Sequence, residues 1–153
     1  MILVNKTSIY YVIFILAIGA GIFGLLFLHH TGPAHTAILH GSIDIPVSIA
    51  DTEQSRDQGL SDTASLPVDA GMLFVFESTG KPGFWMKDMQ YPLDFVWLND
   101  NLEIVDITPT VAVDTYPSVF YPSQPIRCVL EVNAGFSTAH SLKIGQKFEL
   151  VQK

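Results

Sequence analysis

The feature that most constrains this chain is an uncharged, apolar run close to its N-terminus. Residues 9–28 read IYYVIFILAIGAGIFGLLFL and contain no charged side chain. As a helix rising about 1.5 Å per residue, the run would extend about 30 Å, which is the thickness of the hydrocarbon core of a bilayer. The run therefore predicts a transmembrane helix.

The residues on either side of this run predict its orientation. Lys6 precedes it, whereas His29, His30 and a Gly32-Pro33 breaker follow it. Because positive charge is retained on the cytoplasmic side, we expect residues 1–8 in the cytoplasm and the rest of the chain outside. The run is longer than the 7–15 residues usual for a signal peptide. We therefore favour an uncleaved, single-pass signal anchor over its alternatives, a cleaved signal peptide and a buried core helix. The expected localisation is the cell membrane, with an extracytoplasmic C-terminal domain.

The composition after the run is that of one folded domain. The chain has 153 residues, of which 48% are hydrophobic and 11% aromatic, which is too apolar for a disordered chain. Eight basic residues face fifteen acidic ones, giving a net charge of −7. A nucleic-acid-binding protein needs a basic surface to displace the counterions of the phosphates, so this class is excluded. The expected segments are a cytoplasmic N-terminus 1–8, a transmembrane helix 9–28, a juxtamembrane linker 29–37 and one domain 38–153.

Within the domain, short strands are the dominant pattern. Apolar and polar residues alternate from Ile43 to Ile49, which is typical of a half-buried strand, and Pro46 predicts that this strand lies at a sheet edge. The other predicted elements are strands at 71–77, 93–98, 102–107, 126–132 and 146–151, short helices at 52–59 and 137–142, and a proline-rich loop at 108–125. This pattern predicts a mainly β domain, an antiparallel β-sandwich, jelly-roll-like or barrel-like, with one or two short helices.

Six short motifs follow one another along this domain. They are Arg56-x-x-Gly59-Leu60, Gly71-Met-Leu-Phe-Val-Phe76, Phe84-Trp-Met-Lys87, Pro92-Leu-Asp94, Val129-Leu-Glu131 and Ala134-Gly135. Together they resemble the DUF192 family of small, uncharacterised bacterial and archaeal domains, over about residues 40–152. The resemblance implies a compact, mainly antiparallel β fold of sandwich or jelly-roll type and brings no established activity, substrate or cofactor. The family pattern commonly continues Trp-Met-Lys-Asn-Thr, whereas this chain has Asp88-Met89 after the lysine.

The charged residues of these motifs, together with a tryptophan, form the candidate binding surface. Trp85 can stack a sugar ring or another flat ligand, while Lys87 and Asp94 hold it by hydrogen bonds. The alternative is scaffolding, with Trp85 in the core and Lys87 paired to Asp94 or Glu131, because an unpaired buried charge is expensive. The complete set of candidates is Arg56, Trp85, Lys87, Asp88, Asp94 and Glu131.

The function that the sequence favours is a non-catalytic binding module of the cell envelope. Its partners would be the membrane, through a single pass, and an unidentified small ligand or envelope protein. The alternative is a small envelope hydrolase that pairs the carboxylates of Asp94 and either Asp69 or Glu131. The chain has no serine elbow, HExxH, P-loop or GxGxxG motif, so we expect no catalytic residue.

The soft side chains permit a third interpretation. Met86 and Met89, with His40 or His140, offer the thioether and imidazole ligands that Cu(I) prefers. Core packing explains Met86 equally well, and we expect neither a metal nor another cofactor. Cys128 is the sole cysteine and is expected to be a buried structural thiol.

Aromatic residues also occur in the loop 108–125. Tyr116, Phe120 and Tyr121 are placed where loops often display functional groups over a rigid scaffold. They can equally fold back to cover an open end of the β domain, and the sequence does not separate the two interpretations.

Overall fold

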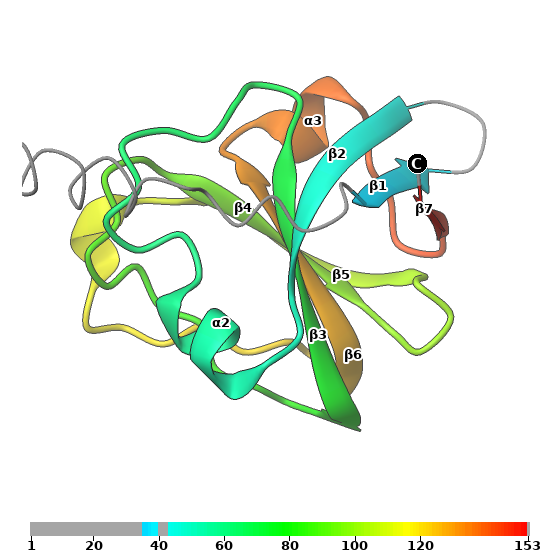
Figure 1. Ribbon diagram of the computed structural model, residues 1–153, viewed down its shortest axis with the longest axis horizontal. Coiled ribbons are helices and arrows are strands. Elements are labelled where there is room, and N and C mark those ends of the chain that lie inside the picture. Colours follow the sequence, from blue (N-terminus) through cyan, green and yellow to red (C-terminus); the bar gives the residue numbers. More distant parts are fainter. Residues whose placement is uncertain (1–34, 40–42, 153) are drawn as a thin grey trace, which may run out of the picture. The chain divides into compact units, whose positions relative to one another are not determined.

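The computed structural model describes residues 35–39 and 43–152, which form a single sheet of seven strands with two short α-helices (Figure 1). The strands run in the order β5-β4-β6-β3-β2-β1-β7. The elements are β1 (His35–Leu39), β2 (Ile43–Ala50), α2 (Glu53–Gln58), β3 (Gly71–Gly80), β4 (Leu93–Leu98), β5 (Ile104–Val111), a 3-10 turn η1 (Val113–Thr115), β6 (Ile126–Asn133), α3 (Phe136–Ala139) and β7 (Phe148–Gln152).

Neighbouring strands are antiparallel with one exception. β2 and β3 run parallel, with Val47 opposite Gly71, whereas the other five neighbouring pairs are antiparallel. A parallel pair needs a crossover of about a dozen residues or more, and residues 51–70, which contain α2, provide it. The prediction of a mainly β domain with one or two short helices is confirmed, and the expected antiparallel pairing holds for every pair except β2–β3.

Hydrogen bonds join the two ends of the strand order. Glu103 and Lys147 form an antiparallel bridge, and the Phe148 N–H donates to the Leu102 carbonyl at 2.9 Å. These bonds connect the approach to β5 with the start of β7. The two edge strands of the sheet therefore approach each other at this one point.

Buried side chains form two clusters, one on each face of the sheet. β4 shows the alternation, since Phe95 and Trp97 belong to one cluster and Val96 and Leu98 to the other. Every residue of β4 is buried, Asp94 included, which explains why the other five residues of the strand are apolar. The aromatic core consists of Ala50, Leu60, Phe74, Phe84, Met86, Leu93, Phe95, Trp97, Val111, Ile126 and Val129. The aliphatic core consists of Ile45, Val47, Leu73, Val96, Leu98, Ile104, Cys128, Leu130, Val132, Phe136, Leu142 and Phe148.

The first strand is the main departure from the predicted elements. Residues 35–37, expected in the linker, lie in β1, which pairs with both β2 and β7. β2 is consequently an internal strand, so the edge position inferred from Pro46 is wrong. Pairing of β2 with β3 begins only at Val47, so Pro46 has no ladder partner on that side and its missing N–H is tolerated.

Among residues 35–39 and 43–152, no helix has both the length and the apolar character needed to cross a membrane. The transmembrane helix predicted at 9–28 lies outside the described residues. The segment 1–8, the start of the linker and His40 lie outside them as well.

Candidate functional site

A cavity of about 180 Å³ lies on the aromatic side of the sheet, where four parts of the chain meet. α2 and the residues after it form one wall, β3 and the segment 82–89 form others, and β6 contributes a single residue. The lining residues are Arg56, Asp57, Gln58, Gly59, Leu60, Ser61, Phe74, Phe76, Pro82, Gly83, Phe84, Trp85, Met89 and Glu131. A second hollow involves only the consecutive residues 145–149 and gathers no distant side chains.

Local signals explain why the first wall forms where it does. The Thr52 side chain accepts from the Ser55 N–H at 3.1 Å, and the Ser55 hydroxyl accepts from the Thr52 N–H at 3.0 Å, a reciprocal cap that begins α2. Gly59 ends the helix with φ of +48°. A β-carbon there would come 3.2 Å from the Phe74 ring, so glycine provides both the turn and the close approach to the cavity wall.

Arg56 is fixed by the backbone rather than by an acid. Its Nη1 donates to the Asp51 carbonyl at 2.6 Å and to the Val75 carbonyl at 2.9 Å. Its guanidinium carbon lies 5.3 Å from the centroid of the Phe76 ring, which is cation–π distance. Nε and Nη2 form no hydrogen bond with any residue that the structure describes, so part of the guanidinium fork remains available in the cavity wall.

The segment 82–89 presents alternate residues inward and outward. Phe84 exchanges backbone hydrogen bonds of 2.9 and 2.8 Å with Phe120, and its ring packs edge-on against Phe74 and Trp97. Because Phe84 points into the aromatic core, Trp85 faces the other way and is 53% exposed. Trp85 is therefore not a core residue, and the scaffolding interpretation fails for it.

Two further contacts hold this segment against the residues after α2. The Ser61 hydroxyl donates to the Lys87 carbonyl at 3.0 Å, and the Asp62 N–H donates to the Asp88 carbonyl at 2.9 Å. Asp88 has φ of +56°, a left-handed conformation that Asn and Asp tolerate better than most residues. This backbone requirement explains why either an amide or an acid suits the position after Lys87.

Glu131 is the buried acid of the cavity. It is only 5% exposed and lies on the aromatic side of β6, opposite Met72 of β3 and Phe95 of β4. In the part of the chain that the structure describes, no donor forms a hydrogen bond with its carboxyl group. Burial raises the pKa of Glu131 from 4.5 to about 8, because the charged form loses water and gains no cation in return.

Asp94 lies on the opposite face of the sheet. It pairs with Val132 of the aliphatic core, and since cross-strand partners share a face, its side chain points away from that of Glu131. Asp94 is fully buried, and its carboxylate accepts the backbone N–H groups of Thr110, Gly135 and Ser137 at 2.8–3.0 Å. Asp94 does not line the cavity, and it is satisfied by the fold itself.

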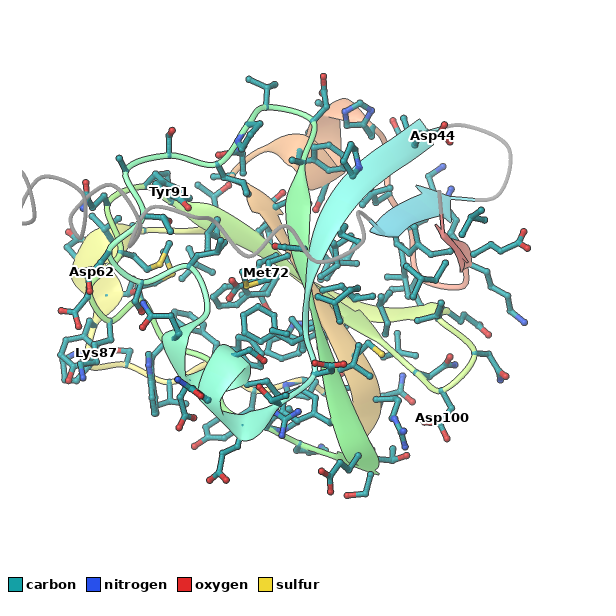
Figure 2. All side chains as sticks on the ribbon, in the orientation of Figure 1. Asp44, Asp62, Met72, Lys87, Tyr91 and Asp100 are labelled. Carbon is teal, nitrogen blue, oxygen red and sulfur yellow. The ribbon has the colours of Figure 1, made fainter. Side chains whose placement is uncertain are left out.

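Lys87 and Asp88 lie at the surface. Their ion pair measures 4.0 Å, and both side chains are more than half exposed. Figure 2 shows Lys87 at the periphery of the molecule and Met72 near its centre. Neither Lys87 nor Asp88 lines the cavity, and Lys87 pairs with neither Asp94 nor Glu131. Of the six candidates, Arg56, Trp85 and Glu131 are brought together, and Lys87, Asp88 and Asp94 are not.

The structure separates the residues of the hydrolase and copper alternatives. Asp94 and Glu131 face opposite sides of the sheet, and Asp69 is exposed and lies outside the cavity. Met86 is buried in the aromatic core, whereas the His140 ring packs at 4.2 Å on Phe136 of the aliphatic core. Among the residues described, no three His, Cys, Asp or Glu side chains are grouped to hold a metal.

The remaining expectations concern the thiol and the proline-rich loop. Cys128 is buried, as predicted, and burial raises the pKa of its thiol to about 11. Of the aromatic residues in the loop 108–125, one folds back onto the β domain and two are displayed at the surface. Phe120 packs against the aromatic core, while Tyr116 and Tyr121 are 50% and 61% exposed.

Sequence reasoning missed several residues of the cavity. Phe74 and Phe76 lie in an apolar segment, 71–77, from which the sequence predicts only a buried strand. Nothing in the sequence shows that a cavity lies beside these two rings. Asp57 lies next to Arg56 and was overlooked because it belongs to an ordinary polar helix. The available signal was Gly59 within a motif and Gly83 directly before one, since glycine often marks a close backbone approach.

The fold and the cavity define a small β domain with an aromatic hollow, in which Glu131 receives no hydrogen bond from the described part of the chain. The chain belongs to the DUF192 family, described as "Uncharacterized ACR", whose model matches residues 36–150. A comparison with curated proteins finds no match.

Solved structures of other proteins share this fold. A proposed transcription regulator from Sinorhizobium meliloti 1021 is 29% identical, with a TM-score of 0.69 over 76% of this chain and 91% of that one. A protein of unknown function from Novosphingobium aromaticivorans is 22% identical, with a TM-score of 0.69 over 76% of this chain and 83% of that one. The second likeness concerns the fold alone.

Proposed function

We propose that this protein is a membrane-anchored module of the cell envelope that binds a small ligand in the cavity beside Glu131. The observation that carries the proposal is the carboxyl group of Glu131, which lines the cavity, is only 5% exposed as a residue, and receives no hydrogen bond from any residue that the structure describes. Buried polar groups are almost always satisfied within a fold. A carboxyl group that lines a hollow and has no donor within the described fold is therefore suited to bind a donor group of a ligand.

The walls of the cavity support binding of a compact organic molecule. Phe74, Phe76, Phe84 and Trp85 surround it, and Arg56 adds a fixed charge. Small-molecule sites combine mostly apolar walls with a few polar groups that orient the ligand. At about 180 Å³ the cavity is smaller than the roughly 300–1,000 Å³ of drug-sized sites, which favours a ligand with few atoms.

Placement in the envelope rests on the sequence of residues 9–28. The apolar run has the length of a bilayer core and follows the only positive charges of the N-terminal region. This arrangement supports export of the domain with an uncleaved anchor.

A role in transcription is not favoured, although one structural neighbour carries that description. All fifteen acidic residues of this chain lie after residue 37, together with seven of its eight basic residues. A domain with this surplus of negative charge lacks the electrostatic attraction on which DNA binding depends. The hydrolase alternative is also weaker, because Asp94, the carboxylate that both of its pairings require, is turned away from the cavity.

The test is a fragment screen on the purified full-length chain, followed by NMR of its two tryptophan indoles. Fragments that bind the cavity should shift the Trp85 indole signal and leave that of Trp97, which is buried and donates to Thr108 at 2.9 Å. Glu131→Gln should lower the affinity of these fragments by about tenfold. Glu103→Gln, which replaces an acid outside the cavity, should leave their affinity unchanged. A screen in which no fragment moves the Trp85 signal would refute the binding site. An alkaline phosphatase fused to the C-terminus should be active, and an inactive fusion would refute export.

A further inference from the structure

We propose that the cavity selects a small aliphatic zwitterion, whose ammonium group pairs with Glu131 and whose carboxylate group pairs with Arg56. This inference rests on the proposed function and names the ligand class for the same site. Free amino acids, with the amine on the α-carbon or at the end of the chain, have this chemistry.

The first support is that the cavity holds two opposite groups that do not pair with each other. Arg56 is kept on its own wall by the carbonyls of Asp51 and Val75 and by the Phe76 ring. Glu131 has no cation close enough to offset its burial. In most proteins such an Arg and Glu would be drawn into one ion pair, because each relieves the desolvation of the other. Both side chains line the same cavity and form no ion pair with each other, so a donor fork and an acceptor are both available to a ligand there.

The second support is the geometry of the free atoms. Nε and Nη2 of Arg56 form no hydrogen bond with the described residues, and this edge of a guanidinium matches a carboxylate in two parallel hydrogen bonds. At the other end, the carboxyl group of Glu131 accepts up to four hydrogen bonds when ionised, which suits the three donors of an ammonium group.

The third support is the character of the walls between these ends. Phe74, Phe84 and Trp85 offer ring faces and edges that pack against methylene groups, and ring faces also attract an ammonium group. Besides Arg56 and Glu131, the charged residue that lines the cavity is Asp57 of α2. The residues that flank Glu131 on β3 and β4, Met72 and Phe95, do not titrate.

The experiment uses ω-amino acids of increasing length, from glycine to 6-aminohexanoate, titrated into the full-length chain by calorimetry. Each is compared with the alkylamine and the carboxylic acid of the same chain length. We expect one length to bind best, and both single-charge counterparts of that length to bind about tenfold more weakly or worse. Because Glu131 is largely protonated at pH 7, pairing with an ammonium should release close to one proton per ligand, measured as a dependence of the binding heat on the buffer.

Two variants assign the ends of the ligand. Glu131→Gln should abolish proton release and reduce binding of the amino acid to that of the acid alone. Arg56→Lys, which keeps the charge but loses the fork, should reduce binding to that of the amine alone. Asp114→Asn, a control at an exposed acid outside the cavity, should change neither quantity.

The proposal is overturned if no amino acid binds more tightly than its single-charge counterparts, or if binding releases no proton. If fragments still shift the Trp85 signal in that case, the cavity is a binding site for another class of ligand. If neither fragments nor amino acids bind, the proposed function fails together with the inference.

Discussion

Asp94 and Glu131 are both buried acids on neighbouring strands of one sheet, but only Asp94 receives hydrogen-bond donors from the described fold. Asp94 faces the aliphatic side and receives three backbone N–H groups. Glu131 faces the aromatic side and receives none from the described residues. The two residues are offset by a single position in the β4–β6 register, and this offset places them on opposite faces.

The difference shows that burial alone does not identify a functional acid. The Asp94 carboxylate connects β4 to the turn before α3 and to β5, so the fold supplies all of its partners. The Glu131 carboxyl group is largely removed from water, reaches only the cavity, and receives no donor from the described residues, so its charged form is poorly stabilised. The first arrangement stabilises the domain, and the second reduces its stability unless a ligand donor is present.

The largest expected effect is that of Asp94→Ala. The substitution leaves three backbone N–H groups without their acceptor, and each buried, unsatisfied donor costs about 1–3 kcal/mol. We expect the free energy of unfolding to fall by about 3–5 kcal/mol, measured by urea denaturation of the full-length chain. Asp114→Ala, at an exposed acid, is the control and should be close to neutral. A fall of less than about 1 kcal/mol would show that water replaces the carboxylate and that Asp94 is not a structural acid.

The second effect is a stability that depends on pH through Glu131. The pKa of Glu131 is about 8 in the folded chain against an ordinary 4.5, so between these values the unfolded chain binds fewer protons than the folded one. The contribution of Glu131 to the free energy of unfolding should therefore be greatest below pH 4.5. It should fall by up to a few kcal/mol as the pH rises from 4.5 through 8.

Replacing this acid sharpens the measurement. Urea denaturation of Glu131→Gln at several pH values should show a smaller decrease between pH 5 and 8 than the unsubstituted chain, and Glu103→Gln should retain the full decrease. An unchanged slope in Glu131→Gln would mean that Glu131 ionises freely, and the contrast with Asp94 would then be lost.

The sequence was sufficient to predict most of the β domain. Alternating apolar and polar residues, or mainly apolar runs, located β2, β3, β4 and β6 to within a few residues. This worked because burial on one or both faces of a strand determines which of its positions are apolar. β1 was missed since it begins within a stretch of His, Gly and Pro. The parallel pairing of β2 with β3 was missed because local patterns carry no information about strand neighbours.

The site was only half predictable for the same reason. The motifs gave equal weight to Arg56, Trp85 and Glu131, which line the cavity, and to Lys87, Asp88 and Asp94, which do not. Whether an acid points into the cavity or into the opposite core is decided by its parity in a strand and by the register of that strand with its neighbours. Parity can be read from the sequence, whereas the register between β4 and β6 depends on contacts across more than thirty residues of chain.

The smallest expected effect is that of Lys87→Ala. Lys87 belongs to the most conspicuous motif of the chain, yet its side chain is more than half exposed and its one ion pair, with Asp88, is 4.0 Å long. Exposed pairs contribute about 0–1 kcal/mol, so the free energy of unfolding should change by less than about 0.5 kcal/mol, and binding in the cavity should be unchanged. The contact that Lys87 makes to the cavity wall is through its carbonyl, which accepts from Ser61 and which alanine retains. A loss of binding in Lys87→Ala with unchanged stability would extend the site beyond the cavity and onto the surface around Asp88.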